Sequence, residues 1–552
     1  MRKRTTALLL SALLALTTIV SGCGKPKSTA LFSWEDRKLN IIEDNYRNYY
    51  EIFVRSFYDS DGNSLGDLKG VTGKLDYIKN LGFNGIWLMP IMPSPTYHKY
   101  DTTDYRAIDK EYGTMEDFEE LIKEAHARGI RVIIDFVMNH SSSKHPWFTK
   151  ACEFLKTVKS TDSRSIEALA SECPYVGYYH FTREKKNGTY YRVGNSDFYY
   201  EGQFWSEMPD LNYDCKELRA EFEDIAKFWI DKGVDGFRMD ATLHFEEGDT
   251  DFNTEVMNWI YTYAKSLNPE FYMVSEVWSG KGEIANYYRS KTDSLFNFDA
   301  ASAEGMIIGT VRGNTKATAF VNAMADYDKT FGSVYPDYID APFLTNHDMG
   351  RVCNALNGDM NLIKFAGGLL LSMKGSPFVY YGEEIGMKSK GTKDENKRLP
   401  MVWGEEEGMT KAPSGADSGI AQNFAGVAEQ LTDEGSILNY YRRALLIRNQ
   451  NPEIARGTIS IVSKATEGNA AAMVKTFNGS SIAILYNNSA TDAHTFDSKA
   501  VYTIKNELES AVGTTSKGVE IVGFLTVDNS EIKLEGEELT LPARSIVYLK
   551  LR

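Results

Sequence analysis

The sequence alternates short apolar runs with amphipathic stretches of helical periodicity, and this alternation restricts the fold more than any other feature. Eight runs have the length and composition of strands: residues 50–55, 83–89, 131–137, 234–240, 271–276, 294–298, 339–345 and 377–381. Val132, Ile133 and Ile134 are consecutive, as expected for a strand that is buried on both faces. Eight strand–helix units predict an α/β fold that closes as a (β/α)8 TIM barrel.

The helical stretches carry their own start and stop signals. Thr114 and Asp117 have the spacing of a capping box at the start of a helix predicted over residues 114–128. Gly129 follows the last apolar position and is expected to end that helix. A last long helix is predicted over residues 436–449.

Two regions depart from the alternation and predict additional domains. Residues 139–212 hold no clear strand–helix unit, which indicates a small domain inserted after the third strand. From about Gly457 onward, short alternating strands such as residues 481–486 indicate an antiparallel β-domain. The expected order is a lipoprotein signal peptide at 1–22, a tether at 23–44, a catalytic barrel at 45–138 and 213–455, an inserted domain B at 139–212, and a C-terminal β-sandwich at 456–552.

The N-terminus has the features of a targeting segment. Arg2, Lys3 and Arg4 precede an apolar run over residues 7–20, which is short for a membrane-spanning helix. The run leads into Val-Ser-Gly-Cys23, which resembles a bacterial lipobox, so we expect cleavage before Cys23 and lipid attachment to its thiol. The expected location is extracytoplasmic, anchored to a bacterial membrane. The alternative is an ordinary secretory signal with an incidental cysteine.

Composition excludes some classes of partner. The formal net charge is −15 at pH 7, and a chain without a basic stripe is a poor binder of nucleic acid. No other segment is apolar enough to span a membrane, so we expect the protein to meet a membrane only through its lipid anchor. We also expect a monomer. The remaining cysteines, Cys152, Cys173, Cys215 and Cys353, match no metal motif, and the sequence does not decide whether they pair.

Carboxylates stand at the ends of several predicted strands. Asp135 lies near the end of one, Asp240 and Glu276 close two others, and Asp348 follows a fourth. A single acid at a strand end is usually a helix cap or part of a turn, but capping does not account for several acids at the ends of different strands. Because the active site of a (β/α)8 barrel lies at the C-terminal ends of its strands, these acids predict a catalytic centre.

The spacing of these residues suggests a division of roles. Arg238 and Asp240 are two residues apart, so their side chains share a strand face, and the cation is expected to lower the pKa of Asp240. Glu276 is expected on the neighbouring strand, beside that negative charge, where its pKa should be raised. A nucleophile paired with a general acid is what glycoside hydrolysis with retention requires.

Six segments resemble the conserved regions of the α-amylase family, glycoside hydrolase family 13. They are DFVMNH (135–140), GFRMDATLH (236–244), VSEVW (274–278), FLTNHD (343–348), MPDLN (208–212) and the stretch 61–77. The resemblance covers roughly residues 45–450. It implies Asp240 as nucleophile, Glu276 as acid/base and Asp348 as stabiliser of the transition state. It also implies a set of substrate-binding residues: Tyr100, Asp101, His140, Arg238, His347 and Arg398.

Subfamily features point in two directions. MPDLN is typical of the group between oligo-1,6-glucosidases and neopullulanases, and residues 397–403 resemble the oligo-1,6-glucosidases. Exo-acting relatives carry an acid before the position of Tyr100, whereas Tyr97 and His98 here resemble the open-ended amylases. Leu243 replaces a lysine that amylases often have, which affects contacts on the leaving-group side.

Two calcium sites are expected. Asp59, Asp61, Asn63 and Asp67, with the carbonyl of Leu65, present hard oxygen ligands at alternate residues, and a solvated acidic turn is the alternative. The second site is implied by the family resemblance alone and lies between the barrel and the inserted domain. Its ligands would be Asn139, Asp210 and the carbonyl of His244.

The sequence therefore predicts a retaining, endo-acting α-amylase that hydrolyses α-1,4-glucosidic bonds of starch and maltooligosaccharides. Within the same family the alternatives are an exo-α-glucosidase, a neopullulanase and a 4-α-glucanotransferase. From another class, the alternative is a non-catalytic sugar-binding lipoprotein, which has no need of a nucleophile and an acid.

Overall fold

The computed structural model describes residues 39–186, 188–404 and 406–552, and the part from Leu39 to Arg552 forms one compact unit. The predicted signal peptide, Cys23 and residues 23–38 of the tether lie outside the described residues. Within the described part of the chain, no helix has the length and apolar character needed to cross a membrane. The four cysteines beyond Cys23 are free thiols.

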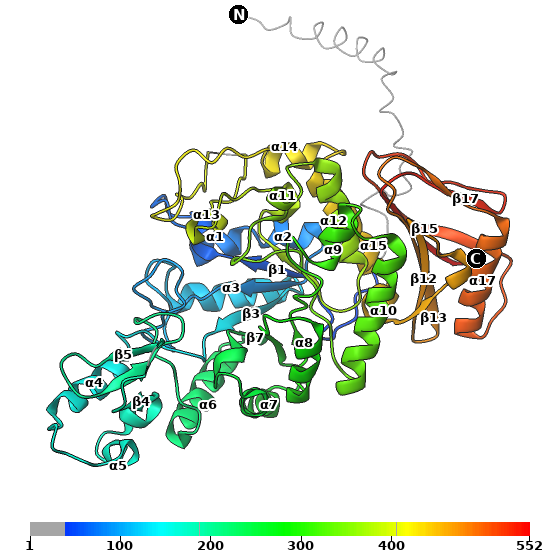
Figure 1. Cartoon of the computed structure of the whole chain (residues 1–552). Helices are drawn as coiled ribbons and strands as arrows, with labels where there is room; N and C mark the ends of the chain where they lie inside the picture. Colours follow the sequence, from blue (N-terminus) through cyan, green and yellow to red (C-terminus); the bar gives the residue numbers. More distant parts are fainter. Residues whose placement is uncertain (1–38, 187, 405) are drawn as a thin grey trace, which may run out of the picture. The chain divides into compact units, whose positions relative to one another are not determined.

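A parallel sheet forms the centre of the structure (Figure 1). Its strands are β1 (Tyr49–Ile52), β2 (Gly85–Leu88), β3 (Arg131–Phe136), β7 (Gly236–Met239), β8 (Tyr272–Ser275), β9 (Ser294–Leu295) and β10 (Phe378–Tyr380). They pair in the order β10-β1-β2-β3-β7-β8-β9, and every pairing is parallel. Each of these strands falls inside, or within one residue of, a run predicted as a strand, and the (β/α)8 barrel is confirmed.

The predicted strand over residues 339–345 is not a regular strand. It joins its neighbours through single bridges, from Ala341 to Phe296 on the β9 side and from Phe343 to Phe378 in β10. Pro342 interrupts the segment, and proline has no N–H to contribute to a ladder. The segment still lies between β9 and β10, so it occupies the remaining position of the barrel.

Helices and short helical turns connect the barrel strands or follow the last of them. They are η1 (Val54–Ser56), α1 (Leu68–Gly73), α2 (Leu75–Leu81), α3 (Met115–Ala127), α6 (Lys216–Asp231), η3 (Thr242–His244), α7 (Thr250–Leu267), α8 (Lys281–Tyr287), η4 (Tyr288–Ser290), α9 (Met306–Val311), α10 (Ala317–Val334), α11 (Val352–Ala355), α12 (Met360–Ser372), η5 (Glu383–Ile385), α13 (Asp394–Lys397), α14 (Val427–Thr432), α15 (Ile437–Gln450) and α16 (Glu453–Arg456).

Helix α3 shows how local sequence sets these boundaries. Thr114 caps it, and both hydrogen bonds of the predicted capping box with Asp117 are present. Phe118 and Leu121 are fully buried on its inner face, and burial of each such side chain contributes roughly 1.5–3 kcal/mol. Gly129 follows with a φ of 72°, which ends the helix as predicted.

The segment between β3 and α6 holds smaller elements. They are α4 (Pro146–Thr157), α5 (Ile166–Ala170), η2 (Pro174–Tyr178), β4 (Phe181–Thr182), β5 (Tyr190–Arg192) and β6 (Tyr199–Glu201). The strands form an antiparallel sheet in the order β4-β6-β5. This segment ends at Asp210 and Leu211, which bridge back to His140 and Tyr179 and so close it against the end of β3.

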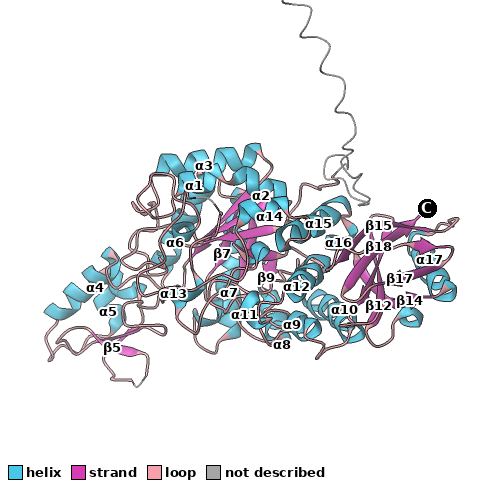
Figure 2. Ribbon diagram, turned by 90° about the horizontal axis from the view of Figure 1, so that it is seen from above, coloured by secondary structure: helices cyan, strands magenta, loops and turns pink. Residues whose placement is uncertain are grey.

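The C-terminal region is built from antiparallel strands and one helix that the sequence pattern did not predict. Its elements are β11 (Thr458–Ile461), η6 (Ser463–Ala465), β12 (Ala470–Phe477), β13 (Ser480–Asn487), β14 (His494–Phe496), α17 (Ser498–Val512), β15 (Val519–Thr526), β16 (Leu534–Glu535), β17 (Glu538–Leu541) and β18 (Ser545–Leu551). One sheet has the order β11-β12-β13-β18-β15 and the other β14-β17-β16. Figure 2 shows α17 beside these strands.

Candidate active site

A pocket of about 380 Å³ lies at the C-terminal ends of the barrel strands. Asp240 follows β7 and Glu276 follows β8, while the other walls come from loops. The lining residues are His98, Tyr100, His140, Phe204, Trp205, Met208, Asp240, Ala241, Glu276, Trp278, Asp348, Asp394 and Arg398. Most of the predicted substrate and catalytic residues are therefore brought together, with Arg238 and His347 buried next to them.

Arg238 connects the carboxylates at the floor of the pocket. It pairs in register with Asp135 of β3, and its Nη1 donates to Asp135 at 2.9 Å and to Asp240 at 2.6 Å. Its Nη2 lies 3.0 Å from Glu276 Oε2. A single guanidinium thus holds three acids from three adjacent strands, because parallel strands bring their C-terminal ends to one edge.

Burial dominates the electrostatics of the two central acids. It raises the pKa of Glu276, as predicted, although Arg238 works against the shift. Burial also raises the pKa of Asp240, so the expected net lowering by Arg238 is wrong in direction. The reason is that Arg238 divides its charge among Asp135, Asp240 and Glu276 while all three lose contact with water.

The backbone at Ala241 is strained next to the site. Ala241 has a φ of 49°, a left-handed conformation that costs a residue other than glycine roughly 1–3 kcal/mol. In that conformation its N–H donates to Glu276 Oε2 at 2.9 Å. The turn after Asp240 therefore fixes the orientation of Glu276 on the neighbouring strand.

Asp348 lies on the opposite wall between two cations. Its Oδ1 accepts from Arg398 at 2.8 Å, and its Oδ2 lies 2.9 Å from His347 Nε2. Burial alone would raise the pKa of Asp348, but His347 and Arg398 hold it well below its usual range. Asp348 therefore stays ionised, in contrast to Glu276.

Two further residues predicted to bind substrate, His140 and Asp101, lie at different places relative to the pocket. His140 lines the pocket, its Nε2 has no hydrogen-bond partner among the described residues, and burial lowers its pKa to about 4. Asp101 instead lies behind the pocket wall, fully buried, where its Oδ1 accepts from Ser94 at 2.6 Å. A direct contact of Asp101 with substrate remains a prediction.

Three exposed aromatic side chains on the pocket rim were not singled out from the sequence. Phe204, Trp205 and Trp278 are 50%, 47% and 49% exposed, which is unusual for such large apolar groups. Trp278 stacks on Phe298 with ring centroids 4.9 Å apart, so its orientation is fixed. The available signal was the abundance of aromatics in residues 139–212 and the Trp at the end of VSEVW.

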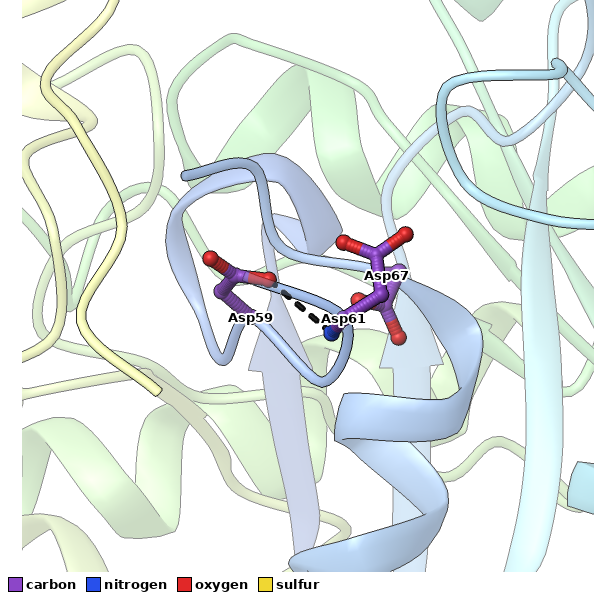
Figure 3. Close-up of side chains that lie close together, drawn as sticks. All are labelled: Asp59, Asp61 and Asp67. Atoms are coloured by element: carbon purple, nitrogen blue, oxygen red, sulfur yellow. Dashed lines mark hydrogen bonds between the residues drawn. The ribbon is translucent and has the colours of Figure 1, made fainter. Parts of the chain in front are cut away.

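Asp59, Asp61 and Asp67 lie together in the loop before α1 (Figure 3), with carboxylate oxygens within 4.8 Å of one another. Asp59 accepts from the backbone N–H groups of Asp61 and Gly62, at 3.1 and 2.7 Å, so the loop folds around its carboxylate. Asn63 belongs to the same turn and accepts from the N–H of Leu65 at 2.7 Å. Three like charges this close repel one another, and a hard divalent cation fits that donor set.

The second predicted metal site contains one potential ligand atom with an unsatisfied hydrogen-bonding capacity. The Oδ1 of Asn139 is buried without a hydrogen-bond partner among the described residues, and its Nδ2 lies 3.4 Å from Asp210. Burial raises the pKa of Asp210 to about 8. His244 ends η3 nearby in the chain, after Asp240. An unsatisfied amide oxygen beside a buried carboxylate fits a cation better than it fits a dry core.

Comparison with known proteins agrees with this geometry. Residues 51–457 match the family described as "Alpha amylase, catalytic domain". Alpha-amylase 3 of Dictyoglomus thermophilum is 41% identical over 421 residues, which cover 75% of this chain and 79% of that protein. An oligo-1,6-glucosidase of Heyndrickxia coagulans is 30% identical over 487 residues, covering 72% of this chain and 84% of that protein.

The solved structure of Eubacterium rectale Amy13B superposes with a TM-score of 0.87 at 40% identity, covering 93% of this chain and 97% of that chain. A barrel with a buried cluster of acids at its strand ends, together with these matches, identifies a glycoside hydrolase. The chain belongs to the α-amylase family, glycoside hydrolase family 13, and is an enzyme that acts on α-glucans.

Proposed function

We propose that the enzyme is an endo-acting α-amylase that hydrolyses α-1,4-glucosidic bonds of starch and maltooligosaccharides with retention of configuration. The observation that carries this proposal is the pairing of Asp240 and Glu276 on one buried guanidinium, at the floor of a pocket with an exposed aromatic rim. A non-catalytic sugar-binding lipoprotein is set aside, because the chain is an enzyme.

In the proposed mechanism, a carboxylate oxygen of Asp240 attacks the anomeric carbon and the bond to the leaving sugar breaks. Glu276 gives its proton to the leaving oxygen, which its raised pKa supports. Glu276 then accepts a proton from water, and that water oxygen attacks the anomeric carbon and releases Asp240. The anionic Asp348 stabilises positive charge on the sugar ring, and Tyr100 and His140 contact the same sugar.

The endo assignment rests on the rim of the pocket. Arg398 donates to the Tyr97 hydroxyl at 3.0 Å, at the position where exo-acting relatives place an acid that grips the chain end. Phe204, Trp205 and Trp278 offer flat surfaces to neighbouring sugars. Bound sugars beyond the cleavage point add interactions that orient the reacting bond. Because the chain is also similar to oligo-1,6-glucosidases, the alternatives to an endo-acting amylase are still an exo-glucosidase, a neopullulanase and a 4-α-glucanotransferase.

The product profile on amylose, pullulan and maltotriose tests this proposal. We expect amylose to lose viscosity before much reducing sugar appears, and the first products to be α-anomers. Trp278→Ala should lower kcat/KM for long maltooligosaccharides by roughly tenfold, about 1.4 kcal/mol, with little effect on maltotriose. Tyr502→Ala, which removes an exposed aromatic from α17, serves as the control. Release of single glucose units, fastest from maltose, would instead favour an exo-glucosidase.

We also propose calcium as the ligand of the Asp59, Asp61, Asn63, Leu65 and Asp67 loop. A second calcium would bind Asn139, Asp210 and the carbonyl of His244. The close carboxylates of the first set and the orphaned amide oxygen of the second support these assignments. Calcium would supply charge neutralisation to both loops, with no role in bond cleavage.

We propose further that Cys23 carries a lipid anchor. The support is the lipobox-like sequence, since Cys23 lies outside the described residues. Cys23→Ser should move the protein from the membrane fraction to the soluble extracytoplasmic fraction. A variant that still fractionates with membranes would contradict lipid attachment at this residue.

A further inference from the structure

His347 lies between two carboxylates, one on each ring nitrogen. Its Nδ1 is 2.6 Å from Glu51 Oε1, and its Nε2 is 2.9 Å from Asp348 Oδ2. The Nε2 is also 2.7 Å from the Tyr100 hydroxyl, which itself donates to Asp135 at 3.0 Å. Glu51 belongs to β1 and is 1% exposed, and His347 is 0% exposed, so water does not separate these groups.

The hydrogen-bonding capacities of these groups determine the proton count on the ring. An ionised carboxylate only accepts, and a neutral imidazole has a single N–H. Burial raises the pKa of Glu51, while the charge and the hydrogen bond of His347 oppose that rise. When Glu51 is ionised, hydrogen bonds to Glu51 and Asp348 at the same time require both ring nitrogens of His347 to carry a proton. Burial alone would lower the pKa of His347, but Asp348 and Glu51 raise it to about 9.

We propose that Glu51 is a positioning residue that keeps His347 doubly protonated, so that its Nε2–H stays directed at Asp348 and Tyr100. Glu51 does not line the pocket, and the hydrogen bond that links it to the site among the described residues is the one to the imidazole of His347. The inference rests on the proposed role of Asp348 in catalysis. It adds a residue on β1, across the barrel from Asp240, to the groups on which that role depends.

The other groups around the ring do not supply a second anion at Nδ1. The rings of Trp87 and Tyr100 pack against His347 with centroids 5.5 Å away. Asp135 and Asp240 interact with the imidazole electrostatically, but both are hydrogen-bonded to Arg238. Without the charge of Glu51, a neutral ring that keeps its proton on Nδ1 would turn a lone pair toward Asp348.

Glu51→Gln tests the proposal, because the amide oxygen still accepts from Nδ1–H while the charge is removed. The imidazole of His347 is followed by nitrogen-15 NMR over pH 5–10 in histidine-labelled protein, with its signal assigned by comparison with His347→Gln. In the unchanged protein we expect protonation to persist to about pH 9. In Glu51→Gln the pKa should fall by roughly one to three pH units. Glu384→Gln is the matched control: Glu384 is equally buried but accepts from Tyr50 and Tyr77 instead.

Activity provides the second readout. The alkaline limb of kcat should move to lower pH or become steeper in Glu51→Gln, because His347 then loses its proton there, while KM changes less than kcat. Any α-glucan that the enzyme cleaves serves as substrate, so failure of the endo assignment would not affect the result. The proposal is overturned by a His347 pKa near 6.5 in the unchanged protein, by the same titration in both proteins, or by an activity loss of equal factor at every pH. If Glu51→Gln does not fold, Glu51→Ala, which also removes the charge, is titrated in the same way and should show the same fall in the pKa of His347.

Discussion

Arg238 is the residue on which the charge balance of the pocket depends, since it contacts Asp135, Asp240 and Glu276 together. The sequence motif and the strand spacing were sufficient to predict that these side chains converge. The direction of the Asp240 pKa was not predictable, because it depends on how one cation is shared and on how completely the carboxylates are buried. Sequence spacing carries neither quantity.

Glu276→Gln tests the proposed acid directly. The amide keeps the shape of the side chain and can still accept from the Ala241 N–H, but it has no proton to give to the leaving oxygen. We expect kcat to fall by roughly 10²–10⁴-fold while maltooligosaccharide binding, measured by calorimetry, is retained. Glu283→Gln on α8, outside the pocket lining, is the control and should keep full activity. Turnover within tenfold of the unchanged enzyme would move the acid role to another group.

At the scale of elements, α4 begins at an unusual cap that couples its stability to pH. The Nδ1 of His145 accepts from the Trp147 N–H at 3.1 Å, and burial followed by the nearby Arg106 lowers the pKa of His145 to about 3. A protonated ring cannot accept at Nδ1, so protonation and capping exclude each other. Asparagine caps helices without titrating.

Stability should therefore fall on the acid side because of His145. Since the pKa is about 6.5 in the unfolded chain and about 3 in the fold, the stabilisation is complete above pH 6.5 and is lost as pH falls toward 3. Between pH 6.5 and 5 the unfolding free energy should drop by about 2 kcal/mol through this group, at about 1.4 kcal/mol per pH unit. Denaturant unfolding at pH 7 and 5 should show a smaller drop for His145→Asn. Equal drops in both proteins would contradict the coupling.

The sequence was largely sufficient to predict which helices and strands exist and in what order, but not the hydrogen bonding between neighbouring strands. The capping box of α3 and the glycine after it follow from local chemistry, so the predicted helix was correct to within a residue at each end. The segment with Pro342 has a strand-like composition, yet its ladder is reduced to single bridges by a missing N–H. Helix α17 was missed because the alternating strands around it dominate the pattern of that region.

At the scale of the whole molecule, the proposed calcium ions should stabilise the fold rather than take part in chemistry. A ligand that binds only the folded state adds about 2.7 kcal/mol at a hundredfold excess over its Kd. Chelation should therefore lower Tm, and Asp61→Ala should reduce that effect, leaving the part due to the second site. Asp214→Ala, which changes an exposed aspartate elsewhere, is the control. A chelator effect of the same size in Asp61→Ala would place the metal elsewhere.

At this scale, the predicted domain boundaries stay a prediction. The C-terminal region is joined to the barrel by buried polar contacts: Lys475 donates to the carbonyls of Ser372 and Ile454 at 2.8 Å each. A buried amine of this kind has no sequence signature, because an isolated lysine in a strand is read as exposed. The contact partners are up to 103 residues apart, which local pattern does not reach.

The direction of the barrel strands gives the two ends of the molecule different surroundings. The described chain enters at the N-terminal end, where the Asn40 N–H donates to the carbonyl of Asn449 and β1 begins at Tyr49, whereas the pocket lies at the opposite end. The pocket and the point where the described chain begins thus lie at opposite ends of the barrel, so the proposed attachment at Cys23 would join the barrel at the end that does not bind glucan.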